Sequence, residues 1–304
     1  MNNLIKKEII EKFKKYNFQK YPFVFTDVNY KNLINWNDLN KLLEKDILHY
    51  PRVRMANDNF PEIRGYKGFI RYTYSQTGDR TPHINRHQLY KCLRDGATLI
   101  VDRCQSFFES VDESRLWLSK ELECTCSANL YAAFTATPSF GLHFDNHDVI
   151  AVQIEGIKKW KVYNPTYSYP LEDERSFDYL PPNTSPDYEF DITPGQAIYL
   201  PAGYWHNVTT QSKHSLHISF TVIRPRRLEL FKTLFDELKN NPYMREPIEH
   251  GDSLSDKEKI KTIITNAINS FDIQFAENML KAQSRTYRYR SEEHTSELQS
   301  RLHL

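Results

Sequence analysis

Residues 141–165, GLHFDNHDVIAVQIEGIKKWKVYNP, contain two His-Asp pairs whose side chains could bind a metal ion. In the first pair, one residue separates His143 from Asp145. Successive side chains of a strand point to opposite faces, so these two would project to the same side. Together they would offer two adjacent ligand atoms. Alone, such a pair is also typical of a surface turn or a strand end, and the second pair, His147 and Asp148, complicates the choice.

A third ligand is available in GQAIYLPAGYWHNV, where His206 follows a turn that Pro201 and Gly203 shape after a strand beginning at Gly195. This spacing resembles the second motif of the cupin barrel, whose histidine completes a metal site. Two histidines and a carboxylate on one face form the facial triad of non-haem Fe(II) oxygenases. The predicted triad is therefore His143, Asp145 and His206, with about three positions open for other ligands.

The lysines of EGIKKWKVY suggest how an anionic co-substrate would be held. Lys158 and Trp160 share one face of the expected strand, and Lys159 and Lys161 share the other. The tryptophan is the apolar residue expected inside, which makes Lys158 the inward lysine. A buried ammonium group needs an anion, and the far carboxylate of a metal-chelating dicarboxylate would meet that need. The alternative is a lysine on a solvated rim.

Three motifs in this order, H-x-D, G-x-K-x-W and P-x-G-x-x-H, resemble those of the JmjC-type Fe(II)- and 2-oxoglutarate-dependent oxygenases. The likeness is strongest to their cupin-like, ribosomal-oxygenase-like branch and covers roughly residues 20–280. It implies that the triad binds iron, that Lys158 binds the C5 carboxylate of 2-oxoglutarate, and that O2 is the second co-substrate. The ligand pair of this family ends at Asp145, which leaves His147 beside the site.

Further polar residues are candidates for contacts in the same pocket. The stretch NLY matches an N-x-Y strand of that branch, which implies that Asn129 and Tyr131 face the substrate. In HSLHISFT, four polar side chains share one face: Ser215, His217, Ser219 and Thr221. We assign the first two to the substrate and the last two to the cofactor. Ordinary strand packing or a solvent-facing strand would explain the same patterns.

The spacing of apolar residues predicts a mainly β fold with flanking helices. Helical spacing occupies residues 1–50, a helix is expected to end at Asp95-Gly96 before a strand over 97–101, and SRLWLSKELE is amphipathic. Short alternating runs then continue from SANLYAAFTA to SLHISFTVI, as in an antiparallel barrel or sandwich. With the family resemblance, the expected fold is a double-stranded β-helix, the cupin or JmjC jelly roll, followed by a helical segment.

Four regions follow from these patterns. Residues 1–125 should pack on the barrel, 126–224 should form the β core, and 225–289 should be helical. Residues 290–304 resemble the translation of a sequencing adapter, and we expect this tail to be disordered. Its histidines are therefore not candidates for the active site. The helical segment carries two apolar stripes, and the similar family dimerises through its post-barrel helices. We therefore expect a homodimer built on residues 226–281; the alternative is that these helices simply cover the barrel.

Composition narrows the classes of partner. Forty basic and thirty-nine acidic residues nearly cancel, so we expect neither direct nucleic-acid binding nor attachment to a membrane surface. No apolar run approaches the length of a transmembrane helix, and the start of the chain lacks the apolar stretch of a signal peptide. The four cysteines show no paired zinc-binding spacing and are expected to be reduced thiols of a cytoplasmic protein.

The expected function is hydroxylation of an amino-acid side chain of a protein or peptide. A small-molecule hydroxylase on the same scaffold would need the same motifs and remains an alternative. A metal-bound cupin that binds without turnover is a third possibility, although such a module has no physical need for an inward lysine at position 158.

Overall fold

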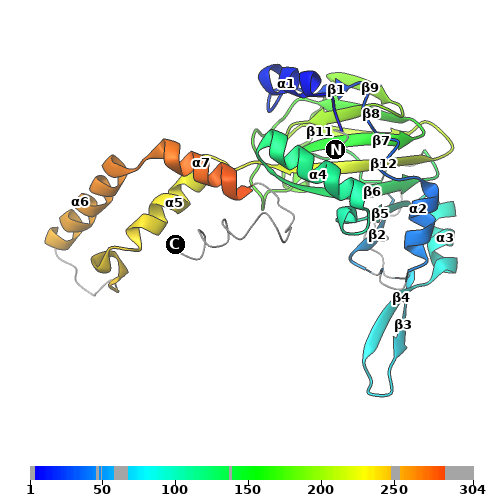
Figure 1. Ribbon diagram of the computed structural model, residues 1–304, viewed down its shortest axis with the longest axis horizontal. Helices are drawn as coiled ribbons and strands as arrows, with labels where there is room; N and C mark the ends of the chain where they lie inside the picture. The colour runs from blue at the N-terminus through cyan, green and yellow to red at the C-terminus, as the bar shows by residue number, and fades with distance from the viewer. Residues whose placement is uncertain are drawn as a thin grey trace.

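The computed structural model describes residues 4–45, 48, 50–57, 68–136, 139–247 and 254–284. Two antiparallel sheets form its centre (Figure 1). The larger has seven strands, in the order β1 (Phe23–Phe25), β10 (Ala197–Leu200), β7 (Asp148–Glu155), β12 (Ser215–Ile223), β6 (Thr125–Ala133), β5 (Thr98–Val101) and β2 (Val53–Ala56). The smaller has the order β11 (Trp205–Thr210), β8 (Lys158–Tyr163) and β9 (Tyr188–Ile192). This arrangement confirms the predicted double-stranded β-helix.

The larger sheet is buried on both faces, which explains the nearly continuous apolar sequence of β7. Val149 and Ala151 belong to the apolar cluster between the two sheets, together with Trp160 of β8. Ile150 and Val152 point the other way, into the cluster beneath the N-terminal helices. Because neighbouring residues of a strand face opposite sides, one strand serves both cores.

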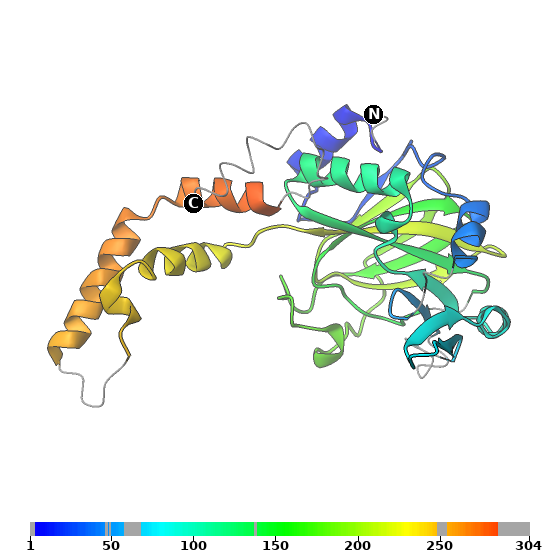
Figure 2. The same ribbon diagram turned by 60° about the horizontal axis from the view of Figure 1, so that its bottom comes forward.

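Helices from the N-terminal part of the chain cover the outer face of the larger sheet. They are α1 (Lys7–Tyr16), α2 (Trp36–Leu43), α3 (Arg86–Arg94) and α4 (Glu109–Leu122). In α1, the predicted apolar face is buried through Ile10 and Phe13, and the Phe13 ring meets the Tyr199 ring of β10 edge-on at 4.7 Å. Figure 2 shows α1 and α4 lying over the sheet.

The region before residue 126 also contributes strands. β1, β5 and β2 extend the larger sheet, and the boundary expected between residues 125 and 126 falls inside β6. An addition to the predicted elements is a hairpin of β3 (Ile70–Tyr74) and β4 (Arg80–Ile84), which forms a separate sheet and projects from the body (Figure 1).

The helical segment after β12 consists of α5 (Glu229–Leu238), α6 (Leu254–Ser270) and α7 (Ile273–Ser284). These three helices form an arm that extends from the barrel instead of covering it (Figures 1 and 2). α7 returns to the body, where the Thr125 hydroxyl donates to the Ser284 carbonyl at 2.8 Å. Residues 290–304 lie outside the described part. Within the described residues, no helix has the length and apolar character needed to cross a membrane.

Candidate active site

The two predicted histidine ligands lie next to each other on facing segments of backbone. His143 and His206 form an isolated antiparallel bridge, and their rings are 4.3 Å apart between centroids. Residue 143 therefore lies in extended chain just before β7 and not within a regular strand, while His206 is the second residue of β11. The expected shared face of His143 and Asp145 is nevertheless present.

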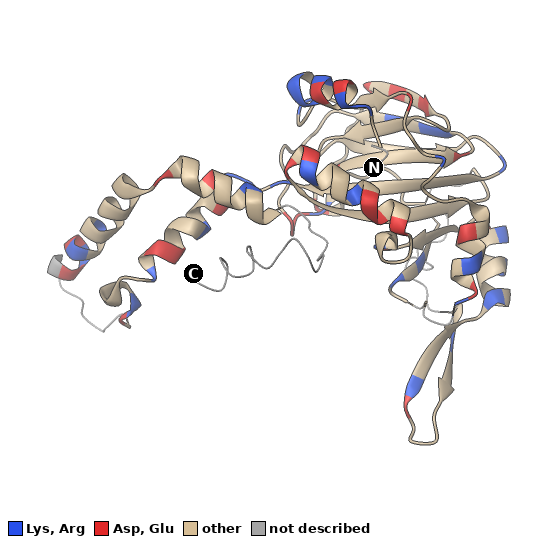
Figure 3. Cartoon of the chain, viewed as in Figure 1, with Lys and Arg blue, Asp and Glu red and all other residues tan. Residues whose placement is uncertain are grey.

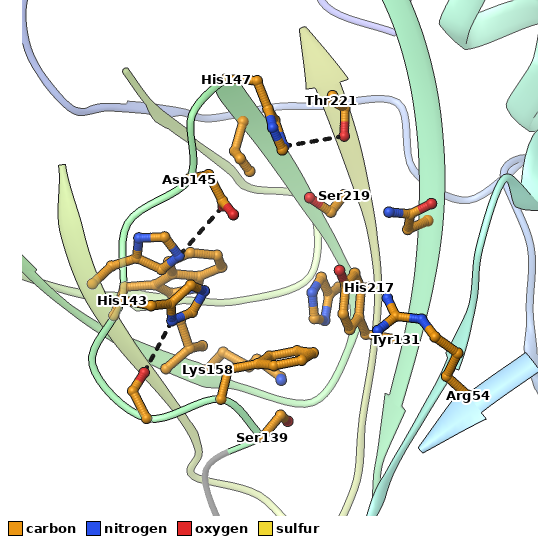
Figure 4. Close-up of a pocket in the computed structure, with 17 residues that line it drawn as sticks. Arg54, Tyr131, Ser139, His143, Asp145, His147, Lys158, His217, Ser219 and Thr221 are labelled. Atoms are coloured by element: carbon orange, nitrogen blue, oxygen red, sulfur yellow. Dashed lines mark hydrogen bonds and ion pairs between the residues drawn. The ribbon is translucent and has the colours of Figure 1, made fainter. Parts of the chain in front are cut away.

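The three predicted ligands converge. One donor atom each from His143, Asp145 and His206 can be chosen such that all lie within 4.8 Å of one another. A carboxylate oxygen of Asp145 is 3.7 Å from Nε2 of His206. Figure 4 shows His143 and Asp145 on one wall of a pocket, which His206 also lines. This spacing is typical of ligand atoms around one metal ion. The three side chains are close together without being hydrogen-bonded to one another.

Backbone carbonyls orient both imidazoles. Nδ1 of His143 is 3.0 Å from the Gly141 carbonyl, and Nδ1 of His206 is 3.1 Å from the Tyr204 carbonyl. A carbonyl can only accept, so each Nδ1 carries the proton and each Nε2 offers its lone pair to the pocket. Burial lowers the pKa of His206 to about 4, which keeps this ring neutral and able to bind a metal.

The pKa of the Asp145 carboxyl is lowered, although burial alone would raise it. Electrostatic interaction with the imidazoles of His147, His206 and His143 outweighs the desolvation of the carboxylate. The carboxylate is thus ionised at neutral pH, as a metal ligand must be. Its backbone is held as well, because the Gly203 amide donates to the Asp145 carbonyl at 2.9 Å.

The second His-Asp pair has other roles. Asp148 is buried, with one carboxylate oxygen accepting from the Tyr199 hydroxyl and the other from the Ala202 amide, each at 2.8 Å. These bonds tie the start of β7 to the turn before His206. His147 lines the pocket, and its Nε2 lies 3.3 Å from the Thr221 hydroxyl.

Lys158 lies inside the barrel, as the alternation predicted. Its side chain is 4% exposed, whereas Lys159 points outward to Glu189 and Asp191. Among the described residues no carboxylate pairs with Lys158, and burial lowers its pKa to about 8. The preceding glycine makes this placement possible: Gly156 has φ +73°, and a Cβ there would lie 2.0 Å from the His214 carbonyl.

The remaining predicted residues divide into two groups. Asn129, Tyr131, His217, Ser219 and Thr221 all line the pocket, which has a volume of about 300 Å³. Ser215 does not line it: the side chain is fully buried, and its hydroxyl accepts from the Gln153 amide at 2.9 Å. The pairing of β12 with β7 shifts between Leu216 and His217, so the alternation that reaches Thr221 does not carry Ser215 to the pocket.

His217 and Tyr131 lie across the pocket from His143 and Asp145 (Figure 4). Their rings stack at 4.8 Å with an interplanar angle of 4°. Nδ1 of His217 is buried and has no hydrogen-bond partner among the described residues. Burial and then the charge of Lys158 lower the pKa of His217 well below its usual value, so the ring is neutral. Burial also raises the pKa of Tyr131, which remains a hydroxyl.

Arg54 belongs to the pocket but has no motif that would have identified it. It comes from β2, and Asp102 fixes its guanidinium through two hydrogen bonds, one of them 2.9 Å long. Ser139, Phe140 and Gly141 complete the wall before His143. In the sequence, only their position just before His143 and Asp145 indicated that these three residues line the pocket.

Known proteins resemble this chain in sequence and in fold. A model of the JmjC domain matches residues 106–230. The match begins about twenty residues before the expected β core and takes in α4. Within the matched residues lie the three candidate ligands, Lys158 and the polar residues of β6 and β12.

Curated relatives are similar to a longer part of the chain. A bifunctional lysine-specific demethylase and histidyl-hydroxylase NO66 of Dictyostelium discoideum is 27% identical over 222 residues, covering 71% of this chain and 41% of that protein. The protein of the same name from Caenorhabditis elegans is 30% identical over 204 residues, or 64% and 25% of the two chains. This chain therefore spans between a quarter and two fifths of those relatives.

Solved structures share the fold. The ribosomal oxygenase YcfD from Escherichia coli, in complex with cobalt and 2-oxoglutarate, is 16% identical with a TM-score of 0.56, covering 98% of this chain and 79% of that chain. A second YcfD structure, with cobalt and succinic acid, has a TM-score of 0.57 at 18% identity, covering 94% and 73%.

Proposed function

We propose that this protein is an Fe(II)- and 2-oxoglutarate-dependent oxygenase that hydroxylates an amino-acid side chain of a protein or peptide. The observation that carries the proposal is the presence, in one pocket, of the three converging ligands and a buried lysine without a carboxylate partner. The relatives named as histidyl-hydroxylases and the neighbour that binds cobalt and 2-oxoglutarate support it.

The donor set suits iron. Two neutral imidazoles and one carboxylate on one face are the ligands of non-haem Fe(II) sites, and they leave positions for 2-oxoglutarate and O2. Bound there, Fe(II) would supply oxygen activation coupled to oxidative decarboxylation of 2-oxoglutarate, giving succinate, CO2 and a hydroxylated product. His143, Asp145 and His206 would hold the metal, with both histidines oriented by carbonyls before it arrives.

Lys158 would hold the far carboxylate of 2-oxoglutarate. Its ammonium group lies in a site from which water is largely removed, so an anion would gain a strong charge-assisted hydrogen bond. His217 lies close enough for the Lys158 charge to affect its pKa, and the open Nδ1 offers the same anion a second polar contact. A non-catalytic cupin would have no use for this costly pair of buried groups.

Asn129 and Tyr131 would orient the substrate side chain. Oδ1 of Asn129 accepts from the Arg103 amide at 2.9 Å, which fixes the side-chain amide, and the Asn129 side chain also hydrogen-bonds to Tyr131. The Tyr131 hydroxyl remains protonated, and its stacking on His217 limits its movement. Both residues line the same pocket as the triad.

The substrate class is tested by a proteome-wide search for hydroxylation. Protein extracts of cells with and without the gene are compared by mass spectrometry for a gain of one oxygen atom on a side chain. A peptide that is hydroxylated only when the gene is present supports the proposal. Complete absence of such a peptide, with a small-molecule product in its place, would favour the small-molecule alternative.

We further propose that the chain forms a homodimer through its helical arm. α5 buries none of its residues, and it exposes Phe231 at 68% and Phe235 at 60%. Leu228, Ile268, Ile273 and Phe275 of the same arm are also more than half exposed. So much exposed apolar surface on a projecting arm is typical of an interaction site, and a second copy of the arm would cover it.

A cytoplasmic location is also proposed. None of the four cysteines, all of which lie in the described part, is in a disulfide. Burial raises the pKa values of Cys104, Cys124 and Cys126, so these thiols are unreactive and suited to a reducing compartment. Fluorescence microscopy of a tagged chain would test the location.

A further inference from the structure

A larger groove opens beside the metal pocket and shares His147 with it. The groove has a volume of about 880 Å³, compared with about 300 Å³ for the metal pocket. Its walls come from the turn before β11, the connection from β12 to α5, residues 165–171, and α7. A chain lying in this groove would pass the entrance to the candidate active site.

The groove carries an excess of positive charge. Its lining includes five cationic side chains: Lys20, Arg224, Arg226, Arg227 and Lys281. The two lining carboxylates are Asp148 and Glu277. Both oxygens of Asp148 already accept hydrogen bonds from within the barrel. The whole chain has a net charge of only +1, so the positive charge of the groove is a local excess. The groove lies where the helical arm joins the barrel, and Figure 3 shows Lys and Arg there.

Arg224 is held in place without using its whole hydrogen-bonding capacity. Its guanidinium lies over the ring of Phe18, at 4.8 Å from the centroid. Nε is buried and has no hydrogen-bond partner among the described residues. Asp148 is close enough for the two charges to interact, but each of its carboxylate oxygens already accepts a hydrogen bond from another group. The charge of Arg224 is therefore fixed at the groove and only partly compensated.

Arg226 is anchored by neutral groups. It donates to the Tyr169 carbonyl at 3.2 Å and to the Asn146 carbonyl at 2.9 Å. The nearby carboxylate is Glu174, which itself accepts from the Leu171 amide. Both terminal nitrogens of Arg226 thus bond to backbone carbonyls, which hold its positive charge at the groove.

We propose that this cationic groove docks an acidic stretch of the substrate polypeptide, next to the residue whose side chain enters the metal pocket. The proposal rests on the proposed function. The shared boundary at His147 places the flanking chain beside the reacting side chain. Exposed Tyr169 adds an apolar contact for a peptide, and the cations select for Asp and Glu in it.

Binding of model ligands to the full chain tests the groove. Three fluorescein-labelled probes are compared by anisotropy at low salt: a ten-residue peptide alternating Glu with Ser and Gly, the same peptide with Gln for Glu, and a ten-nucleotide single-stranded RNA. The acidic peptide should bind at least about tenfold more tightly than the Gln peptide. Its binding should weaken with added salt. Equal binding of the two peptides, or tighter binding of the RNA, would overturn the proposal.

Charge reversal locates the site. The double variant Arg227→Glu, Lys281→Glu should weaken the acidic peptide by at least about tenfold. Arg94→Glu, an exposed arginine at the end of α3 on the far side of the body, is the matched control and should change nothing. Circular dichroism confirms that both variants are folded. An equal effect of the two variants would contradict the assignment to this groove.

Turnover on the same preparations separates the two proposals. Consumption of 2-oxoglutarate without any preference for the acidic peptide would leave the enzyme intact and refute the docking groove. Preferential peptide binding without consumption of 2-oxoglutarate would refute the enzymatic proposal and leave the groove as a peptide-binding surface.

Discussion

His143 and His206 exchange two backbone hydrogen bonds. The His143 amide donates to the His206 carbonyl at 3.1 Å, and the His206 amide donates to the His143 carbonyl at 2.7 Å. Residues 63 positions apart are thereby held as a cross-strand pair. Because the imidazoles are also oriented by carbonyls, the protein builds most of the metal site from its own backbone. We therefore expect the ligand geometry to form without the metal.

The two adjacent lysines of β8 should behave differently. Lys158→Ala should raise the KM for 2-oxoglutarate by about ten- to a hundredfold, because a hydrogen bond to a charged group contributes roughly 1.5–3 kcal/mol. Lys159→Ala should leave it almost unchanged, since this lysine pairs with exposed carboxylates outside the barrel. Steady-state kinetics of succinate formation measures both values. Equal effects would show that Lys158 is not the carboxylate anchor.

The residues around Lys158 illustrate how much of the site can be predicted from sequence. The two-residue alternation of a strand sufficed to place Lys158 and Trp160 inside, and the spacing of the turn before His206 placed the third ligand. The same alternation failed at Ser215, because the shift between Leu216 and His217 breaks the pattern. A local pattern cannot reveal an irregularity that depends on the neighbouring strand.

Strand pairing between segments far apart in the chain was the second feature that could not be predicted from the sequence. Arg54 reaches the pocket only because β2 pairs with β5 and β5 pairs with β6. Those contacts join segments far apart in the chain, and none leaves a periodic signal near residue 54. The projection of the arm was equally hidden, since an apolar stripe is the same whether it covers a barrel or another copy of the chain.

Lys158→Met should stabilise the protein in the absence of ligand. Burial lowers the pKa of this lysine from 10.5 to about 8, so the charged form costs up to about 3 kcal/mol of folding free energy. The cost is fully present below about pH 8 and disappears as the pH rises to 10.5. Denaturant unfolding should therefore show a stability gain for Lys158→Met at pH 7 that shrinks toward pH 10. A constant difference, or a loss at pH 7, would contradict this assignment of the pKa.

Asn129→Asp should separate substrate binding from use of the co-substrate. The new carboxylate can still accept from the Arg103 amide, so the fold should be retained, but the side-chain donor is lost. We expect the KM for 2-oxoglutarate to stay within about twofold while hydroxylation of the protein substrate falls at least about tenfold, as for loss of a buried hydrogen bond. Mass spectrometry of the substrate peptide measures the second value. Undiminished hydroxylation would show that the Asn129 side chain does not bind the substrate.

Two phenylalanines of the arm test the dimer. The double variant Phe231→Glu, Phe235→Glu should be a monomer in sedimentation velocity at micromolar concentration, because it places charges in the apolar interface. Phe177→Glu, in which an 80% exposed aromatic outside the arm is replaced, should remain a dimer. Removal of residues 290–304 should have no effect. A monomeric parent chain would refute the proposed assembly.

The most direct measurement of the central claim is Fe(II)-dependent conversion of 2-oxoglutarate to succinate by the parent chain and by Asp145→Ala and His206→Ala. Circular dichroism should show all three proteins folded, since the bridge between residues 143 and 206 is made by backbone atoms. The account predicts conversion by the parent that a chelator abolishes, and no detectable conversion by either variant. Full activity in both variants, or none in the iron-loaded parent, would contradict it.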